Sequence, residues 1–335
     1  MAQTTTATKP ATTKRLTTEE LRDAKKELAT ALTRGDDHHL TDYLDTLVRT
    51  AANARRAHGV FKRWSMSNQL TLESQRRRLA ESHHGLYAGT AQWAKLGRLI
   101  RDDSRPKVIW AFAGTDEDDQ QQQPGQPARH ARARFVPVAV YDWTDTEYED
   151  PSMIEPDWSV PLAAGDRATF DALVASAPTE VTILDQPSRA EHGLLTKDGI
   201  TLYNASSTVG NQIETLAHEL GHFHLDHLTR LAAASKGAER DEVRAVCEQE
   251  AQLVSWLTMK VLGLDEQVGN DVTVSTATYL RSWTDADTGE QIDGTKRRMK
   301  LLTQRLDVAM TAVDTIVEAY LAVANPTAQS SVAAV

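Results

Sequence analysis

The sequence predicts an α+β protein built from two modules in tandem. Apolar residues recur at helical spacing over two long stretches of the second half, 239–264 and 295–323. Short runs of extended type occur in both halves, for example at 108–113. Charge also divides the chain, because residues 41–112 hold 13 Lys and Arg against 6 Asp and Glu, whereas the whole chain has a net charge of −10. A basic segment joined to an acidic remainder favours two modules of different function.

The two ends of the chain, residues 1–15 and 326–335, are predicted to be disordered tails. Residues 1–15 consist mainly of Thr, Ala and Lys without a hydrophobic segment, so they do not resemble a secretory signal. No apolar run approaches the length of a membrane span. Cys247 is the single cysteine, which excludes an intrachain disulfide and fits a reducing cytosol. We therefore expect a cytoplasmic protein without a membrane partner.

The first module is predicted to span residues 16–147. It opens with a capping box, in which Thr17 caps a helix and Glu20 reaches back to the backbone of the cap. A second helix is expected at about 40–58. Residues 115–134 contain four consecutive Gln and read as a low-complexity loop between two strands.

Aromatic and basic side chains are interleaved in this module. Proteins that bind single-stranded nucleic acid need this mixture, because bases stack on the rings while the cations track phosphates, and each stacked base contributes about 1–3 kcal/mol. A solvated helical surface explains the charge equally well, and for any one tryptophan a place in the core is the better interpretation. The predicted contacts with single-stranded DNA are Lys62, Arg63, Trp64, Asn68, Arg76, Arg77, Arg78, Trp93 and Arg98.

A linker rich in Pro and Asp, 148–165, leads to the second module, 166–325. Leu194–Tyr203 is predicted to form a β-hairpin with an Asp-Gly turn. A strand in this place can present its edge to an extended peptide, and a purely structural hairpin is the alternative.

The segment from His218 to His222 reads H-E-L-G-H and matches the pattern H-E-x-x-H. Residues four apart lie on one face of a helix, so both imidazoles can reach one metal ion. Zinc suits such a site, and Glu219 could take a proton from a zinc-bound water. A solvated helix that carries two histidines by chance is the alternative, but the helical spacing of apolar residues over 213–220 argues against it.

A catalytic zinc requires a third protein ligand. The carboxylates available downstream are Glu239, Asp241, Glu242, Glu248 and Glu250. We favour Glu250, because it lies beside the apolar stripe of the helix at 239–264, and a carboxylate near a buried face is costly unless it binds a charge. For Glu248 we prefer a solvated helical face. His224 is interpreted as packing or as a support for the ligands, and His227 as ordinary surface.

These motifs resemble the ArdC-type antirestriction proteins. In the second module the resemblance rests on His218 to His222, on Glu250-Ala251-Gln252 and on Leu262-Gly263-Leu264-Asp265. In the first module it covers most of 40–147 and rests on Trp64-Ser65, Ala88-Gly89, Leu96-Gly97-Arg98 and the strand at Val108.

The resemblance implies an α/β domain that binds single-stranded DNA, followed by a mostly helical zincin domain similar to the ImmA/IrrE group and to gluzincins. It implies Zn²⁺ held by His218, His222 and Glu250, with Glu219 as the general base of a metallopeptidase. It also implies an antirestriction protein of a mobile element, either a phage or a plasmid.

Two other functions stay open at this point. The protein could protect single-stranded DNA with a zinc that serves only structure, or it could be an ImmA-like protease that cleaves a repressor. Tyr203, His224 and Tyr279 are possible donors to a transition state, and the sequence does not choose among them. The peptide or protein substrate and the oligomeric state are open as well.

Overall fold

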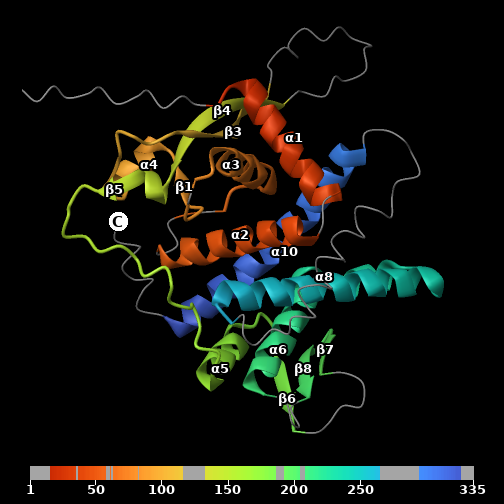
Figure 1. Cartoon of the computed structure of the whole chain (residues 1–335). Coiled ribbons are helices and arrows are strands. Elements are labelled where there is room, and N and C mark those ends of the chain that lie inside the picture. The colour runs from red at the N-terminus through yellow and green to blue at the C-terminus, as the bar shows by residue number, and fades with distance from the viewer. Residues whose placement is uncertain are drawn as a thin grey trace, which may run out of the picture. The chain divides into compact units, whose positions relative to one another are not determined.

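The computed structural model describes residues 16–34, 37–57, 61, 63–81, 83–115, 133–185, 192–203, 208–264 and 294–325. Both predicted tails and most of the low-complexity loop lie outside these residues. The described part of the chain contains helices and three small sheets, which confirms the predicted α+β class. The chain divides into two compact units (Figure 1). Unit 1 comprises Met1–Leu28 and Ser67–Glu155, and unit 2 comprises Ala29–Met66 and Pro156–Val335.

Unit 1 is built on an antiparallel sheet with the strand order β1-β4-β3 and on a second pair, β2 with β5. The predicted capping box is confirmed, since the backbone N–H of Thr17 donates to the Glu20 carboxylate at 2.7 Å and that of Glu20 donates to the Thr17 hydroxyl at 3.2 Å. The elements that lie wholly or partly in unit 1 are α1 (Thr18–Arg34), α3 (Met66–Leu79), β1 (Tyr87–Ala88), α4 (Thr90–Lys95), β2 (Arg98–Ile100), β3 (Lys107–Thr115), β4 (Ala133–Asp142), η2 (Trp143–Asp145) and β5 (Thr146–Tyr148).

Two amide side chains of α3 bind the outer edge of β3. Gln75 donates to the carbonyl of Val108 at 2.8 Å and accepts from its N–H at 2.9 Å. Asn68 makes the same pair of bonds with Trp110, at 3.1 and 3.0 Å. These side chains satisfy backbone groups that a further strand would otherwise pair, so they protect an edge that is prone to aggregation.

Unit 2 combines a three-stranded sheet with long helices. The strand order is β6-β8-β7, with β6 parallel and β7 antiparallel to β8. The β7–β8 pair is the predicted hairpin, which is thereby confirmed. The elements are α2 (Asp37–Arg56), α5 (Arg167–Ser176), β6 (Val181–Leu184), β7 (Gly193–Thr196), β8 (Gly199–Tyr203), α6 (Val209–His224), α7 (His227–Ala233), α8 (Ala238–Leu262) and α10 (Gly294–Ala324).

Helix α2 belongs to unit 2, whereas the boundaries predicted from the sequence place it in the first module. Its apolar face is buried, and its polar residues make ion pairs far along the chain. Asp45 accepts from Lys260 of α8 at 2.7 Å, and Arg55 donates to Asp314 of α10 at 2.9 Å. These contacts join residues more than 200 positions apart, so local sequence patterns could not assign the helix to its unit. Among the described helices, none is long and apolar enough to cross a membrane.

Candidate metal centre and predicted nucleic-acid contacts

Helix α6 holds the H-E-x-x-H motif, as the sequence predicts. Its N-cap is Thr208, whose hydroxyl accepts from the N–H of Asn211 at 3.2 Å. Its apolar residues Ile213, Leu216, Ala217 and Leu220 are buried and fix which side of the helix faces outward. His218 and His222 therefore project together, with their Nε2 atoms 3.0 Å apart.

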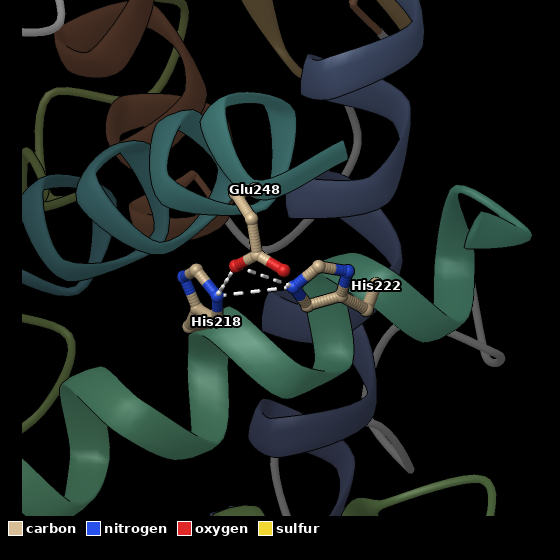
Figure 2. A group of neighbouring side chains, drawn as sticks. All are labelled: His218, His222 and Glu248. Carbon is tan, nitrogen blue, oxygen red and sulfur yellow. Dashed lines mark hydrogen bonds and ion pairs between the residues drawn. The ribbon is translucent and has the colours of Figure 1, made fainter. Parts of the chain in front are cut away.

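Glu248 of α8 completes a group that could hold a metal ion (Figure 2). Its Oε2 lies 3.3 Å from Nε2 of His218 and 3.4 Å from Nε2 of His222. Hydrogen bonds from the two imidazoles hold the pKa of Glu248 well below its usual range. Two imidazole nitrogens and one carboxylate oxygen form the ligand set of many catalytic zinc sites, so these residues fit such an ion.

The structure does not bring Glu250 to this group, which corrects the predicted ligand set. Residues two apart on a helix project about 200° from each other, so Glu248 and Glu250 cannot both face α6. The Glu250 carboxylate accepts from Nε2 of His227 at 3.2 Å and from Arg230. Burial alone would raise its pKa, but these bonds and charges outweigh burial and lower it. The expectation that Glu250 needs a compensating charge was sound, and Arg230 provides it.

Gly221 allows α6 and α8 to approach closely. A Cβ at this position would lie 3.2 Å from the Cα and the carbonyl oxygen of Ala251, and also 3.2 Å from Cβ of Val254. A glycine inside the motif, where it costs about 1 kcal/mol relative to Ala, is thus explained by helix packing. Because the two helices lie close together, the Glu248 carboxylate reaches the two histidines.

Glu219 lies beside the group, on the side of β7, and the residue is only 6% exposed. Burial raises its pKa, although the nearby imidazoles of His218 and His222 act in the opposite direction. A Cβ on Gly193 would lie 2.7 Å from Oε1 of Glu219, so the glycine makes room for the carboxylate. Sequence reasoning missed Gly193, because nothing in the local pattern links the start of this strand to the motif helix.

The group opens into a cleft of about 780 Å³ within unit 2. Apolar side chains of β7 and α7 line it, among them Leu195, Leu228 and Leu231. Tyr203 also lines the cleft, whereas His224 lies in a separate small hollow with Asp307 and Thr311. Of the three possible donors to a transition state, Tyr203 is thus the one that the cleft contains among the described residues, and Tyr279 lies outside them.

The residues predicted to contact DNA are mostly engaged inside their own units. Arg76 and Arg77 both bind the buried Glu73 at 2.6 Å, and Arg78 lies 3.5 Å from Glu27. In unit 2, Arg63 binds Asp307 and Asp314, each at 2.9 Å. These bonds neutralise much of the positive charge that suggested a polyanion partner.

The remaining predicted contacts have structural surroundings too. Arg98 is buried, lies 3.9 Å above the ring of Trp143, and donates to Thr146. Trp93 is fully buried, which bears out the core alternative for this tryptophan. Asn68 binds β3, Trp64 is partly buried, and Lys62 lies outside the described residues.

Sequence reasoning also missed an exposed aromatic surface on the sheet of unit 1. Trp110, Phe112 and Phe135 are 40%, 62% and 54% exposed. Phe112 is directly opposite Phe135 in the β3–β4 register, and Trp110 is two residues from Phe112, so the three side chains share one face of the sheet. The two phenyl rings are 5.9 Å apart in an edge-to-face contact. The sequence signals this surface through Trp110 and Phe112, because residues two apart in a strand lie on the same face of the sheet.

The fold and the site together define an α+β protein with an H-E-x-x-H helix and a His-His-Glu group suited to a divalent metal ion. The chain is similar to crystal structures of the antirestriction ArdC protein from plasmid R388. The metal-free structure shares 17% identity, with a TM-score of 0.45, over 77% of this chain and 86% of that chain. The Mn(II)-bound structure shares 15% identity, with a TM-score of 0.49, over 90% of this chain and 97% of that chain. No protein-family model and no curated protein matches the sequence.

Proposed function

We propose that this chain is an ArdC-like antirestriction protein whose unit 2 hydrolyses peptide bonds with the help of a metal ion. The observation that carries the proposal is the position of Glu219. Its carboxylate lies beside the His218–His222–Glu248 group and next to β7, at the wall of the cleft. A base, a set of metal ligands and a strand edge therefore converge on one site. The antirestriction role rests on the motif resemblance.

His218, His222 and Glu248 would hold the ion, which when bound supplies Lewis acidity toward a carbonyl oxygen and a water molecule. Glu219 takes a proton from the attacking water as the new C–O bond forms. The C–N bond of the peptide then breaks, and Glu219 returns the proton to the leaving nitrogen. Burial raises the pKa of Glu219 above that of an exposed glutamate, a direction that favours its acceptance of the proton.

Strand β7 would align the peptide. Among the described residues, β7 pairs with β8 along one edge only, and Leu194 and Leu195 line the cleft. An extended peptide can add to such an edge through main-chain hydrogen bonds, while alternate side chains enter pockets. An ImmA-like cleavage of a repressor would use the same geometry.

The variant Glu219→Gln tests the hydrolysis. It keeps the size of the side chain and removes the base, so peptide hydrolysis should fall by about 10²–10⁴-fold at unchanged metal content. Glu239→Gln, an exposed residue in the first turn of α8, is the control. Full proteolysis and full antirestriction protection by the Glu219→Gln protein would leave the ion a structural role only.

We propose zinc as the ion, and Mn(II) is the alternative that the R388 structure raises. Imidazole suits zinc well, whereas manganese favours oxygen ligands. Elemental analysis of protein purified without added metal should give about one zinc per chain. Manganese in its place would overturn this assignment and leave the ligand set intact.

We further propose that unit 1 binds single-stranded DNA through the face that carries Trp110, Phe112 and Phe135. Exposed rings that share one face of a sheet offer stacking platforms, and each stacked base contributes about 1–3 kcal/mol. This proposal replaces most of the contacts expected from the sequence, since those side chains are engaged in contacts within their own units. The single cysteine fits a reducing compartment such as the cytoplasm, where entering DNA would be met.

The double variant Phe112→Ala, Phe135→Ala should weaken binding of a single-stranded oligonucleotide by about 10-fold or more. Leu99→Ala, a similarly exposed apolar residue of unit 1, is the control. A salt titration measures the phosphate contacts separately, because each neutralised phosphate adds about 0.7 to the slope. Unchanged affinity of the double variant would contradict this surface.

A further inference from the structure

A chain of three side chains extends from His222 away from the candidate metal site. Nδ1 of His222 lies 2.8 Å from Nδ1 of His227. Nε2 of His227 lies 3.2 Å from Oε2 of Glu250, and Arg230 donates to the same oxygen. His227 is only 1% exposed, so it is a buried imidazole between a candidate ligand and a carboxylate, and not the surface residue expected from the sequence.

The protons of this chain can be placed from the geometry. Nε2 of His222 faces His218 and Glu248, so a metal ion would need the lone pair of that atom. In a neutral imidazole the proton then resides on Nδ1. His222 therefore donates from Nδ1 to Nδ1 of His227, and His227 must carry its own proton on Nε2. That proton points to the Glu250 carboxylate, so every donor in the chain meets an acceptor.

A short turn brings His227 back against His222. Asp226 adopts a left-handed conformation, with φ of 52° and ψ of 41°, between α6 and α7. Residues other than Gly rarely adopt this backbone conformation, although Asp tolerates it better than most. Arg230 follows His227 by one helical turn and accordingly shares its face of α7. The turn therefore places both residues next to Glu250.

We propose that His227 is a positioning residue, which fixes the orientation and the Nδ1–H tautomer of His222 and is itself fixed by Glu250 and Arg230. This inference rests on the proposed metal centre. A hydrogen-bonded partner behind a ligating histidine raises the basicity of the ligand and removes the entropy of ring rotation. Glu250, which the sequence suggested as a ligand, thus supports His222 indirectly, through its hydrogen bond with His227.

Metal affinity of the full chain provides the first test, measured by competition between the protein and a chromophoric zinc chelator. His227→Phe keeps a buried ring but removes the acceptor, so Zn²⁺ should bind about 10–100-fold more weakly. His227→Asn returns an acceptor near the position of Nδ1 and should recover part of the loss. His224→Phe, the same change outside the cleft, should leave the affinity unchanged.

Tautomer assignment provides a second test that needs no variant. Two-bond ¹H–¹⁵N spectra of the zinc-loaded, ¹⁵N-histidine-labelled full chain should show His222 as the Nδ1–H form and His227 as the Nε2–H form. The opposite tautomer at His222 overturns the inference even if His227→Phe fails to fold. Wild-type zinc affinity in His227→Phe also overturns it and leaves the metal centre standing. Failure of the wild-type chain to bind zinc or any other divalent ion would overturn both.

Discussion

Glu248 and Glu250 differ by two positions on α8 and have opposite surroundings. Glu248 faces two imidazole nitrogens, whereas Glu250 faces one imidazole and one guanidinium. The variant Glu248→Gln should therefore lose zinc affinity by more than the roughly 10–100-fold cost of losing a supporting residue. Glu250→Gln keeps an acceptor for His227 and should remain within about 10-fold of the wild type. Chelator competition measures both, and the reverse order would restore Glu250 as the ligand.

Gly193 provides a second test at the scale of one residue. A methyl group there would lie 2.7 Å from Oε1 of Glu219 and 2.8 Å from Cγ2 of Thr215, so the carboxylate must move. Gly193→Ala should reduce peptide hydrolysis by about 10²-fold, the lower end of what general-base help contributes, with zinc content unchanged. Gly89→Ala is the control, since nothing lies within 4 Å of its added methyl group. Wild-type turnover in Gly193→Ala would argue against Glu219 as the base.

The sequence could predict His218, Glu219 and His222 because their spacing on one helix is a local property. The identity of the third candidate ligand depends on which side of α8 faces α6, and this in turn depends on the close approach at Gly221. Several charged residues follow one another on α8, and their order does not indicate how the helix is rotated about its own axis. His227 was missed for the same reason, since its burial depends on the turn at Asp226 and on α8.

At the scale of elements, helix α3 contains a buried carboxylate, Glu73, from which we expect a contribution to stability that depends on pH. Burial alone would raise the pKa of Glu73, but hydrogen bonds from Arg76 and Arg77 outweigh burial and lower the pKa below the usual range of a glutamate. A carboxylate with a depressed folded pKa stabilises the fold above its unfolded pKa, and this stability is lost as pH falls through the folded pKa. The pH range in which this stability is lost therefore begins near the usual pKa of glutamate, about 4.3, and extends below it.

The melting temperature of unit 1 should accordingly fall in the wild type as the pH drops below the usual pKa of glutamate, about 4.3. Glu73→Gln should lower the melting temperature at neutral pH and flatten this dependence. Glu147→Gln, an exposed carboxylate of β5, is the comparison. A profile for Glu73→Gln that parallels the wild type would contradict the role of Glu73.

The elements of unit 2 were predictable in part. Hairpin β7–β8 and helix α6 carry local signals, a turn sequence and an N-cap, and both form where expected. The sheet of unit 1 was harder, because α3 closes the edge of β3 with side-chain amides rather than with a strand. Such an arrangement has no periodic pattern in the sequence.

At the scale of the whole molecule, the assignment of α2 to unit 2 changes which fragment can fold. A fragment of residues 166–335, which contains the predicted second module at 166–325, lacks the buried side chains Leu40, Leu44 and Leu47. Each contributes about 1.5–3 kcal/mol by burial, and the total is comparable with the 5–15 kcal/mol stability of a typical domain. The fragment should lack cooperative unfolding in circular dichroism, and a peptide of residues 37–57 should restore part of it. A fragment that unfolds like the full chain would support the boundary drawn from the sequence.

The candidate ligands come from two helices, α6 and α8, which are separated in the chain by α7. A bound ion would therefore act as a cross-link, and the folding equilibrium would respond to the free concentration of metal. At 100 times the dissociation constant such an ion adds about 2.7 kcal/mol of stability. We expect the melting temperature of unit 2 to rise with added zinc and to fall with a chelator, which calorimetry can follow. In a cell, the lifetime of the protein against proteolysis would then depend on metal supply, so starvation for metal would remove the protein as well as its activity.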